Sequence, residues 1–248
     1  MKGTARAFFV FSNRYHRKNL RFNKMSSSSE NTTISTEPAE AISGDMIETT
    51  STTTVIDLLR HGEVEGDAVF RGSSDDVLSD EGWQQMQNAL ADKGDWDVII
   101  TSPLQRCFEF AESLADDEGL NLHINDQLQE IHFGDWEGQS PDDIMQSDDA
   151  QRLDAWWQSP TKETPPRGED FQDFRSRVLK ALNKISQQYE DENVLIVTHA
   201  GVIRIILMYI LGIQDENLFR LNVDYANFSQ IRIYRDATGE WGTLIKHG

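Results

Sequence analysis

The chain has 248 residues, 38% of them hydrophobic, and a formal net charge of −19, which suits one sizeable soluble α/β domain with a hydrophobic core. The acidity argues against a nucleic-acid partner and against an anionic membrane surface, because both would repel the protein. No apolar run reaches the roughly 20 residues that span a bilayer. The single cysteine, Cys107, excludes an internal disulfide and fits a reducing, cytoplasmic location.

Charge is divided unevenly between the start of the chain and the remainder. Residues 1–24 hold seven Lys and Arg and no acid, which leaves 16 basic and 42 acidic residues in 25–248. The only apolar run in this arm, 7–11, is shorter than the roughly 7–15 apolar residues of a signal peptide. We interpret the arm as a disordered extension or an upstream start ahead of Met25, with a targeting arm as the alternative.

Residues 26–54 are rich in Ser, Thr and Glu and lack the residue types that build a core. Such a composition buries too little apolar area to offset the entropy that is lost on ordering. We therefore predict a disordered N-terminal extension over 1–53 and one folded domain over 54–248.

Regular patterns begin at the predicted domain boundary. Residues 55–59 are apolar and partly β-branched, which is typical of a buried strand. A helix is expected at 79–92 and a second strand at 97–101. The Ser-Pro-Leu-Gln sequence of 102–105 then predicts a helix start, with Ser102 as the N-cap.

The alternation of strands and helices continues to the end of the chain. Residues 171–189 carry apolar side chains at helical spacing, which predicts a long amphipathic helix. We expect the remaining elements as strands at 121–124, 194–198, 229–234 and 243–246, a short helix from 140, and a buried helix at 201–211. This order predicts a single-domain α/β fold, a mainly parallel central sheet with helices on both faces.

Four basic side chains follow the carboxyl ends of three predicted strands. Arg60 and His61 follow the first strand, Arg106 lies in the helix after the second, and His199 follows 194–198. Because ligands of parallel sheets bind beyond these strand ends, the four should form a local positive pocket in an acidic protein. Arginine forks and helix N-termini match the charge and the acceptor oxygens of a phosphate dianion.

Phosphoryl transfer also needs a nucleophile and a proton source. A neutral imidazole attacks phosphorus in line and forms a phosphohistidine, while arginines neutralise the equatorial oxygens of the transition state. A carboxylic acid protonates the leaving oxygen and later deprotonates the attacking water. The pocket therefore predicts phosphate-ester chemistry.

Four segments carry a family resemblance, at 59–63 (Leu-Arg-His-Gly-Glu), 101–107, 128–138 and 197–201. In this order they are similar to the motifs of the histidine phosphatase superfamily, which also includes phosphoglycerate mutases. The resemblance implies a phosphoglycerate mutase-like fold over 54–248 and hydrolysis of a phosphomonoester through a phosphohistidine.

The resemblance also implies a role for each site residue. His61 is the nucleophile, Glu130 is the general acid and base, and the phosphate is held by Arg60, Arg106 and His199. It implies neither a metal nor an organic cofactor, and the sequence itself has no Cys cluster and no His-Glu-x-x-His motif. The expected partner is a small-molecule phosphate ester, and the oligomeric state is left open.

Finer features are similar to α-ribazole phosphatases and related phosphatases of broad specificity. These features lie at 133–138, 140–144 and 165–169, and they imply α-ribazole 5'-phosphate, from cobalamin assembly, as a substrate. One position departs from the family pattern, since Asp67 stands where many relatives have Asn. An ionised carboxylate cannot donate a hydrogen bond to phosphate, and Arg71 is the candidate to supply positive charge instead.

Several alternatives stay open. One alternative function is that of a phosphoglycerate mutase, which returns the phosphate to its product. The other is that of a non-catalytic module, which binds a phosphorylated ligand or another protein. Glu137 and Glu63 compete with Glu130 for the acid role, although we expect Glu137 to shape its loop. Trp156 and Trp157 either line a substrate entrance or pack a cap helix.

Overall fold

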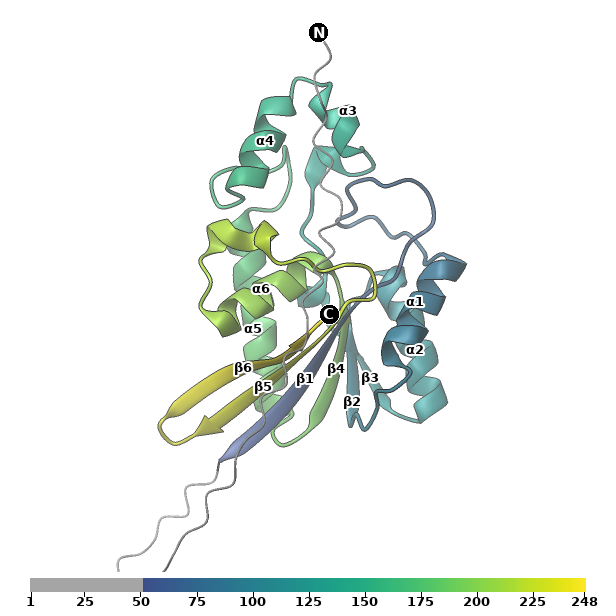
Figure 1. Ribbon diagram of the computed structural model, residues 1–248, viewed down its shortest axis with the longest axis vertical. Coiled ribbons are helices and arrows are strands. Elements are labelled where there is room, and N and C mark those ends of the chain that lie inside the picture. The colour runs from purple at the N-terminus through teal and green to yellow at the C-terminus, as the bar shows by residue number, and fades with distance from the viewer. Residues whose placement is uncertain (1–50) are drawn as a thin grey trace, which may run out of the picture. The chain divides into compact units, whose positions relative to one another are not determined.

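The computed structural model describes residues 51–248, which belong to one compact unit with a six-stranded sheet and helices around it (Figure 1). The strands are β1 (Thr52–Arg60), β2 (Val98–Thr101), β3 (Asn121–Ile124), β4 (Asn193–Thr198), β5 (Phe228–Asp236) and β6 (Gly239–His247). The α-helices are α1 (Asp80–Leu90), α2 (Gln105–Glu118), α3 (Pro141–Met145), α4 (Ala150–Gln158), α5 (Phe171–Gln188) and α6 (Ala200–Leu211). Three short 3₁₀ helices are η1 (Asp126–Leu128), η2 (Gly134–Trp136) and η3 (Asp215–Arg220).

The strand order is β3-β2-β4-β1-β5-β6, and among these strands of 51–248 only β5 runs against its neighbours. The predicted α/β fold with a mainly parallel sheet is therefore confirmed. The register places Arg60 beside Thr198 and Thr101 beside Val197, so β1, β2 and β4 end at the same level. The residues that follow these three strands consequently begin neighbouring loops at one edge of the sheet.

Helices cover both faces of the sheet, as predicted (Figure 1). Alternate side chains of a strand point to opposite faces, so Leu58 packs with α5 and α6 whereas Leu59 packs with α1 and α2. β4 divides in the same way, with Ile196 on the first face and Val197 on the second. Two apolar layers thus hold the sheet, and its carboxyl edge is left for the loops.

The loop after β1 lies directly against the backbone of α1. A Cβ atom added to Gly62 would lie 2.1 Å from the carbonyl oxygen of Gly82, and one added to Gly82 would lie 1.9 Å from that of Glu63. Both distances are far below van der Waals contact, so glycine is needed at both positions. This close packing fixes the path of the chain immediately after His61.

Two predicted element starts are wrong. β1 begins at Thr52, three residues before the predicted strand at 55–59, and the backbone N–H of Thr53 donates to Asp191 at 2.7 Å. Residues 1–50 of the predicted extension, with the basic arm and its alternatives, lie outside the described residues. α2 begins at Gln105, because Asp75 from a preceding loop accepts the Gln105 N–H at 2.7 Å and Ser102 is engaged elsewhere.

Helices α3 and α4 lie beyond the carboxyl edge of the sheet (Figure 1). Trp156 of α4 is only 4% exposed and packs edge-on against Phe70, Phe133 and Trp136 with ring centroids 5.7–6.1 Å apart. Trp157, in contrast, is 40% exposed. The interpretation of Trp156 as packing of a cap helix is confirmed. None of the helices within 51–248 combines the length and apolar character needed to cross a bilayer.

A buried carboxylate sits in the middle of β1. Asp57 accepts hydrogen bonds from Trp96 Nε1 and Gln230 Nε2, each at 2.9 Å, while burial raises the pKa of its carboxyl group. An unsatisfied buried polar group costs about 1–3 kcal/mol. Trp96→Phe is therefore expected to lower the free energy of unfolding by about this amount, measured by urea denaturation.

The matched control is Trp241→Phe, because Trp241 is 49% exposed on β6. This variant should change the free energy of unfolding by less than about 0.5 kcal/mol. Equal losses in the two variants would mean that the hydrogen bond to Asp57 contributes nothing specific.

Candidate active site

His61 is the first residue after β1, and its imidazole is buried, with 6% of the residue exposed. Its Nδ1 lies 2.8 Å from the Gly62 carbonyl oxygen. Because a carbonyl only accepts, Nδ1 carries the proton and the lone pair stays on Nε2. Burial, followed by the charges of Arg60 and Arg106, holds the pKa of His61 well below its usual 6.5. The ring is therefore neutral near pH 7 and has a free nucleophilic nitrogen.

Arg60 places a guanidinium beside this ring. Its Nη1 donates to the Val223 carbonyl at 2.8 Å, and its Cζ lies 4.2 Å from the centroid of the Tyr225 ring. Its Nε is buried and has no hydrogen-bond partner among the described residues. Burial lowers the pKa of Arg60, but guanidinium stays charged at any physiological pH. An unpaired buried donor on a cation is suited to an anionic ligand.

Arg106, in the first turn of α2, is fully buried. It donates to the carbonyls of Gly72 (2.8 Å) and Ser74, and its Nε donates to Nδ1 of His199 at 3.3 Å. A cation at a helix N-terminus is electrostatically unfavourable, and these acceptors compensate for it. A guanidinium has five donors, so one N–H on each terminal nitrogen remains for a ligand.

His199 lies at the end of β4 and is also fully buried. Because Arg106 can only donate, Nδ1 of His199 accepts, and its Nε2 therefore donates to Ser102 Oγ at 2.7 Å. Burial and then Arg106 lower the pKa of His199 well below 6.5. The ring centroids of His61 and His199 are 5.3 Å apart. Ser102, predicted as the N-cap of α2, accepts from His199 and, at 3.4 Å, from the Leu104 N–H, but the N-cap position itself is Leu104.

Glu130 follows η1 in a segment without regular structure. Its Oε2 accepts the Gly201 N–H in the first turn of α6 at 3.0 Å, and its Oε1 accepts the Ile131 N–H at 3.0 Å. A Cβ added to Gly201 would lie 2.2 Å from Oε1, so this approach needs glycine. The negative charge of Glu130 also acts to raise the pKa of Arg60, so the carboxylate lies on the same side of the pocket as that guanidinium.

The two predicted substrate-binding residues differ in position. Arg71 is half-buried, donates to the Glu65 carbonyl at 3.0 Å, and has its Nε 3.3 Å from Asp76 Oδ2. Its charge also helps to lower the pKa of His61, so it lies near the nucleophile. Asp67 is exposed in the same loop. Arg71 thus lies where its charge acts on His61, whereas Asp67 makes no side-chain hydrogen bond or ion pair within 51–248.

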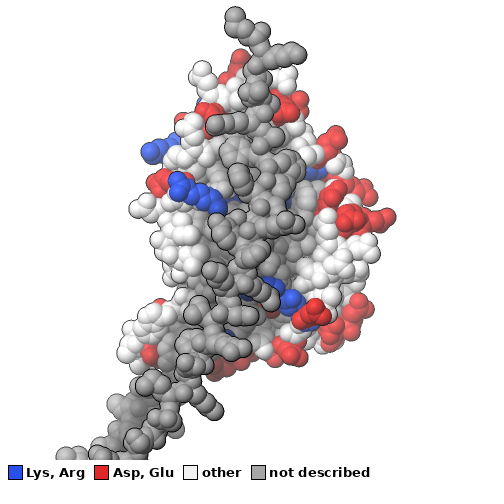
Figure 2. Space-filling view, viewed as in Figure 1, with Lys and Arg blue, Asp and Glu red and all other residues white. Residues whose placement is uncertain are grey.

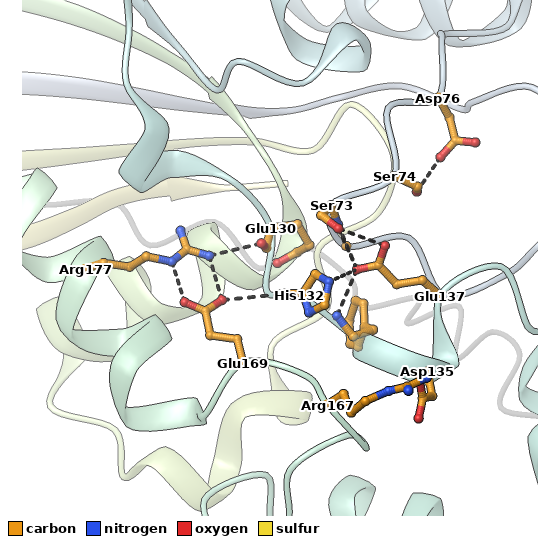
Figure 3. Close-up of polar contacts among 12 residues, drawn as sticks. Ser73, Ser74, Asp76, Glu130, His132, Asp135, Glu137, Arg167, Glu169 and Arg177 are labelled. Carbon is orange, nitrogen blue, oxygen red and sulfur yellow. Dashed lines mark hydrogen bonds and ion pairs between the residues drawn. The ribbon is translucent and has the colours of Figure 1, made fainter.

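Glu137, a competing acid candidate, holds two loops together. Its Oε1 accepts the backbone N–H of Ser73 at 2.9 Å and of Phe133 at 3.0 Å, and Ser73 Oγ also donates to it (Figure 3). Ser73 lies between Gly72 and Ser74, whose carbonyls accept from Arg106. The expectation that Glu137 shapes its loop is confirmed.

Tyr225 was not predicted as part of the site. Its ring is 5.9 Å from that of His61, stacks on Arg60, and is 39% exposed. The neighbouring Ala226 N–H donates to the His61 carbonyl at 3.1 Å, which ties this loop to the nucleophile. The segment between η3 and β5 has neither periodicity nor a motif, so nothing in the sequence predicts that Tyr225 lies beside His61 and Arg60.

The outer surface of α1 and α2 is acidic. On the face in Figure 2, acidic side chains gather along the right margin, where Figure 1 places α1 and α2. These helices carry Asp80, Glu81, Glu109, Glu112, Asp116, Asp117 and Glu118. Within 51–248, no three His, Cys, Asp or Glu side chains are grouped to hold a metal ion. The pocket can bind a tetrahedral anion between two arginines with a neutral imidazole beside it.

Comparison with known proteins agrees with this geometry. The sequence model of the histidine phosphatase superfamily (branch 1) matches residues 56–240. The chain belongs to branch 1 of the histidine phosphatase superfamily. The resemblance predicted from the four motifs is therefore confirmed, and the chain is a phosphatase.

Individual histidine phosphatases resemble the chain over most of their length. It is 32% identical over 180 residues to adenosylcobalamin/alpha-ribazole phosphatase of Escherichia coli K12, covering 71% of this chain and 88% of that protein. It is 29% identical to putative phosphoserine phosphatase 2 of Hydrogenobacter thermophilus, covering 76% and 92%. The crystal structure of a putative alpha-ribazole-5'-P phosphatase from E. coli superposes with a TM-score of 0.69 and 30% identity, covering 79% and 96%.

The lowered pKa values of His61 and His199 predict how the stability of this histidine phosphatase depends on pH. Below about pH 6.5 both imidazoles become protonated in the unfolded chain but stay neutral in the folded protein. The free energy of unfolding therefore falls as the pH falls. Each ring contributes up to ~1.4 kcal/mol per pH unit. In His61→Asn the slope between pH 6.5 and 5.5 should be smaller by this amount. An unchanged slope in urea denaturation would show that His61 binds protons in the folded protein as readily as in the unfolded chain.

The contact between Gly201 and Glu130 yields a second expectation. Gly201→Ala should push the carboxylate away while leaving the fold intact, because the atom at 2.2 Å is the end of the flexible Glu130 side chain and Phe174 Cζ, at 3.2 Å, has to move only by a few tenths of an ångström. Phosphatase turnover is expected to fall about 10- to 100-fold, measured by phosphate release. The control is Gly94→Ala, where an added Cβ meets nothing within 4 Å. Equal activity of the two variants would show that turnover does not depend on the position of the Glu130 carboxylate.

Proposed function

We propose that the chain hydrolyses a small phosphate monoester through a phosphohistidine formed on His61. The observation that carries this proposal is the state of His61, a neutral ring with Nδ1 bonded to Gly62 and Nε2 free beside Arg60 and Arg106. Arg60 and Arg106 hold the phosphoryl oxygens through the unpaired Nε of Arg60 and the remaining donors of Arg106. His199 adds its Nε2–H when a phosphate oxygen replaces Ser102 as the acceptor.

The reaction proceeds in two steps. Nε2 of His61 attacks phosphorus, the bond from phosphorus to the ester oxygen breaks, and Glu130, which enters this step in its protonated form, gives its proton to the leaving oxygen. Glu130 then takes a proton from water, the resulting hydroxide attacks phosphorus, and the phosphorus–nitrogen bond breaks. The two arginines neutralise the equatorial oxygens in both transition states.

We assign α-ribazole 5'-phosphate as the first substrate candidate, with a place in cobalamin assembly. The support is the similarity to the E. coli adenosylcobalamin/alpha-ribazole phosphatase. The exposed Tyr225 ring beside His61 also offers a flat apolar face to the aromatic base of this ester. Phosphoserine is the second candidate, because the Hydrogenobacter relative is named a putative phosphoserine phosphatase.

Covalent catalysis predicts a labelled intermediate. With a ³²P-labelled ester, the wild type quenched in alkali should carry label that is released by acid, as phosphohistidine is. His61→Asn should carry none and should lose at least ~10³-fold in turnover of p-nitrophenyl phosphate. His123→Asn changes an exposed histidine on β3 and serves as the control. Label on His61→Asn would overturn the assignment of the nucleophile.

The substrate is tested by phosphate release from α-ribazole 5'-phosphate, phosphoserine and 3-phosphoglycerate. We expect the highest kcat/KM for α-ribazole 5'-phosphate. Interconversion of phosphoglycerates without release of phosphate would show the mutase alternative instead.

A further inference from the structure

The segment that carries Glu130 has no regular secondary structure of its own. Residues 129–133 connect η1 to η2 and belong to neither a helix nor a strand. A carboxylate that transfers protons must stay within a fraction of an ångström of its working position. The backbone of Glu130 therefore has to be fixed by groups from elsewhere in the fold.

Arg177 of α5 is directed at this segment (Figure 3). Its Nη1 donates to the carbonyls of Gln127 and Gln129, both at 2.8 Å, and its Nη2 donates to the carbonyl of Glu130 at 3.0 Å. The Nε and Nη2 of Arg177 also donate to the two carboxylate oxygens of Glu169 at 2.6 and 2.9 Å. All five donors of the guanidinium are thus used, three of them on carbonyls of η1 and of the irregular residues that follow it.

Glu169 holds the same segment on the other side of Glu130. Its Oε2 accepts the backbone N–H of His132 at 3.3 Å, and its own N–H donates to the His132 carbonyl at 2.8 Å. Both partners of the Arg177–Glu169 pair are 18% exposed, and the Arg177 Cζ lies 4.8 Å from the Phe174 ring centroid. The pair is therefore rigidly seated between α5 and the segment.

We propose that Arg177 and Glu169 are positioning residues, which fix the backbone of Glu130 so that its carboxylate faces Gly201 and the phosphate pocket. This inference rests on the proposed acid role of Glu130. A partly buried ion pair is by itself weak support for stability, because desolvation offsets its attraction. Here the guanidinium of Arg177 makes five hydrogen bonds, of which one goes to the carbonyl of Glu130 and two go to the carbonyls of Gln127 and Gln129, so the pair fixes the backbone on both sides of the carboxylate.

The test compares two leaving groups. An alkyl phosphate needs protonation of its leaving oxygen, whereas p-nitrophenyl phosphate needs little, so loss of the acid slows the alkyl ester selectively. Arg177→Met is expected to lower kcat for the alkyl ester about 10- to 100-fold and kcat for p-nitrophenyl phosphate much less. Glu130→Gln should show the same selectivity. Adding Arg177→Met to Glu130→Gln should cause no further selective loss, because both changes act through one carboxylate.

Arg175→Met is the matched control. Arg175 lies on the same helix and pairs with Asp215 at 3.1 Å, away from Glu130. It should leave the ratio of the two rates unchanged. Arg177→Lys keeps the charge but loses the planar fork, so it should retain most of the defect of Arg177→Met. A fully active Arg177→Lys would overturn positioning by the fork.

Failure of this inference can be told apart from failure of the proposed function. If Glu130→Gln is selective but Arg177→Met slows both esters equally, the positioning role is overturned and Glu130 keeps its role. If Glu130→Gln itself slows both equally, the acid assignment and the positioning role fall together. Should Arg177→Met not fold by circular dichroism, Glu169→Gln is used, which keeps all contacts of Arg177 to the segment carbonyls. It should show the same selectivity at smaller amplitude, and equal slowing would overturn the proposal.

Discussion

Two guanidinium groups and two imidazoles lie in one buried pocket, and this arrangement keeps the guanidinium groups charged and the imidazoles neutral. Guanidinium keeps its proton when buried, whereas imidazole gives it up next to a fixed positive charge. Burial and the arginines therefore leave His61 and His199 neutral. A protonated His61 would have no lone pair for phosphorus. The same arginines that suit an anion thus also keep the nucleophile available.

Such a pocket concentrates positive charge, and the surrounding backbone compensates for it. Arg60 donates to Val223, and Arg106 donates to Gly72 and Ser74 in the loop between β1 and α1. That loop is in turn held by carboxylates, since Asp75 accepts from the start of α2 and Glu137 accepts from Ser73. The acidic composition of the chain is therefore used inside the fold as well as on its surface.

Local patterns in the sequence predict most of the sheet, both helical layers and the convergence of Arg60, His61, Arg106 and His199. They do so because apolar periodicity and strand ends are properties of neighbouring residues. Contacts between distant residues leave no such pattern. The local sequence at Ser102 is typical of a helix cap, yet its hydroxyl oxygen accepts a hydrogen bond from His199, 97 residues away. In the sequence, Arg177 is one of several charged residues on an amphipathic helix. Its hydrogen bonds to the carbonyls of residues 127, 129 and 130 can be seen only in the structure.

The hydrogen bond between His61 Nδ1 and Gly62 has a stereochemical consequence. An imidazole can be phosphorylated on either nitrogen, and the two products are different isomers with different stabilities. With Nδ1 occupied by its proton and turned to the carbonyl, only Nε2 is open to attack. The backbone immediately after β1, held tightly against α1 by Gly62 and Gly82, thus selects a single regioisomer for any phosphorylated form of this ring.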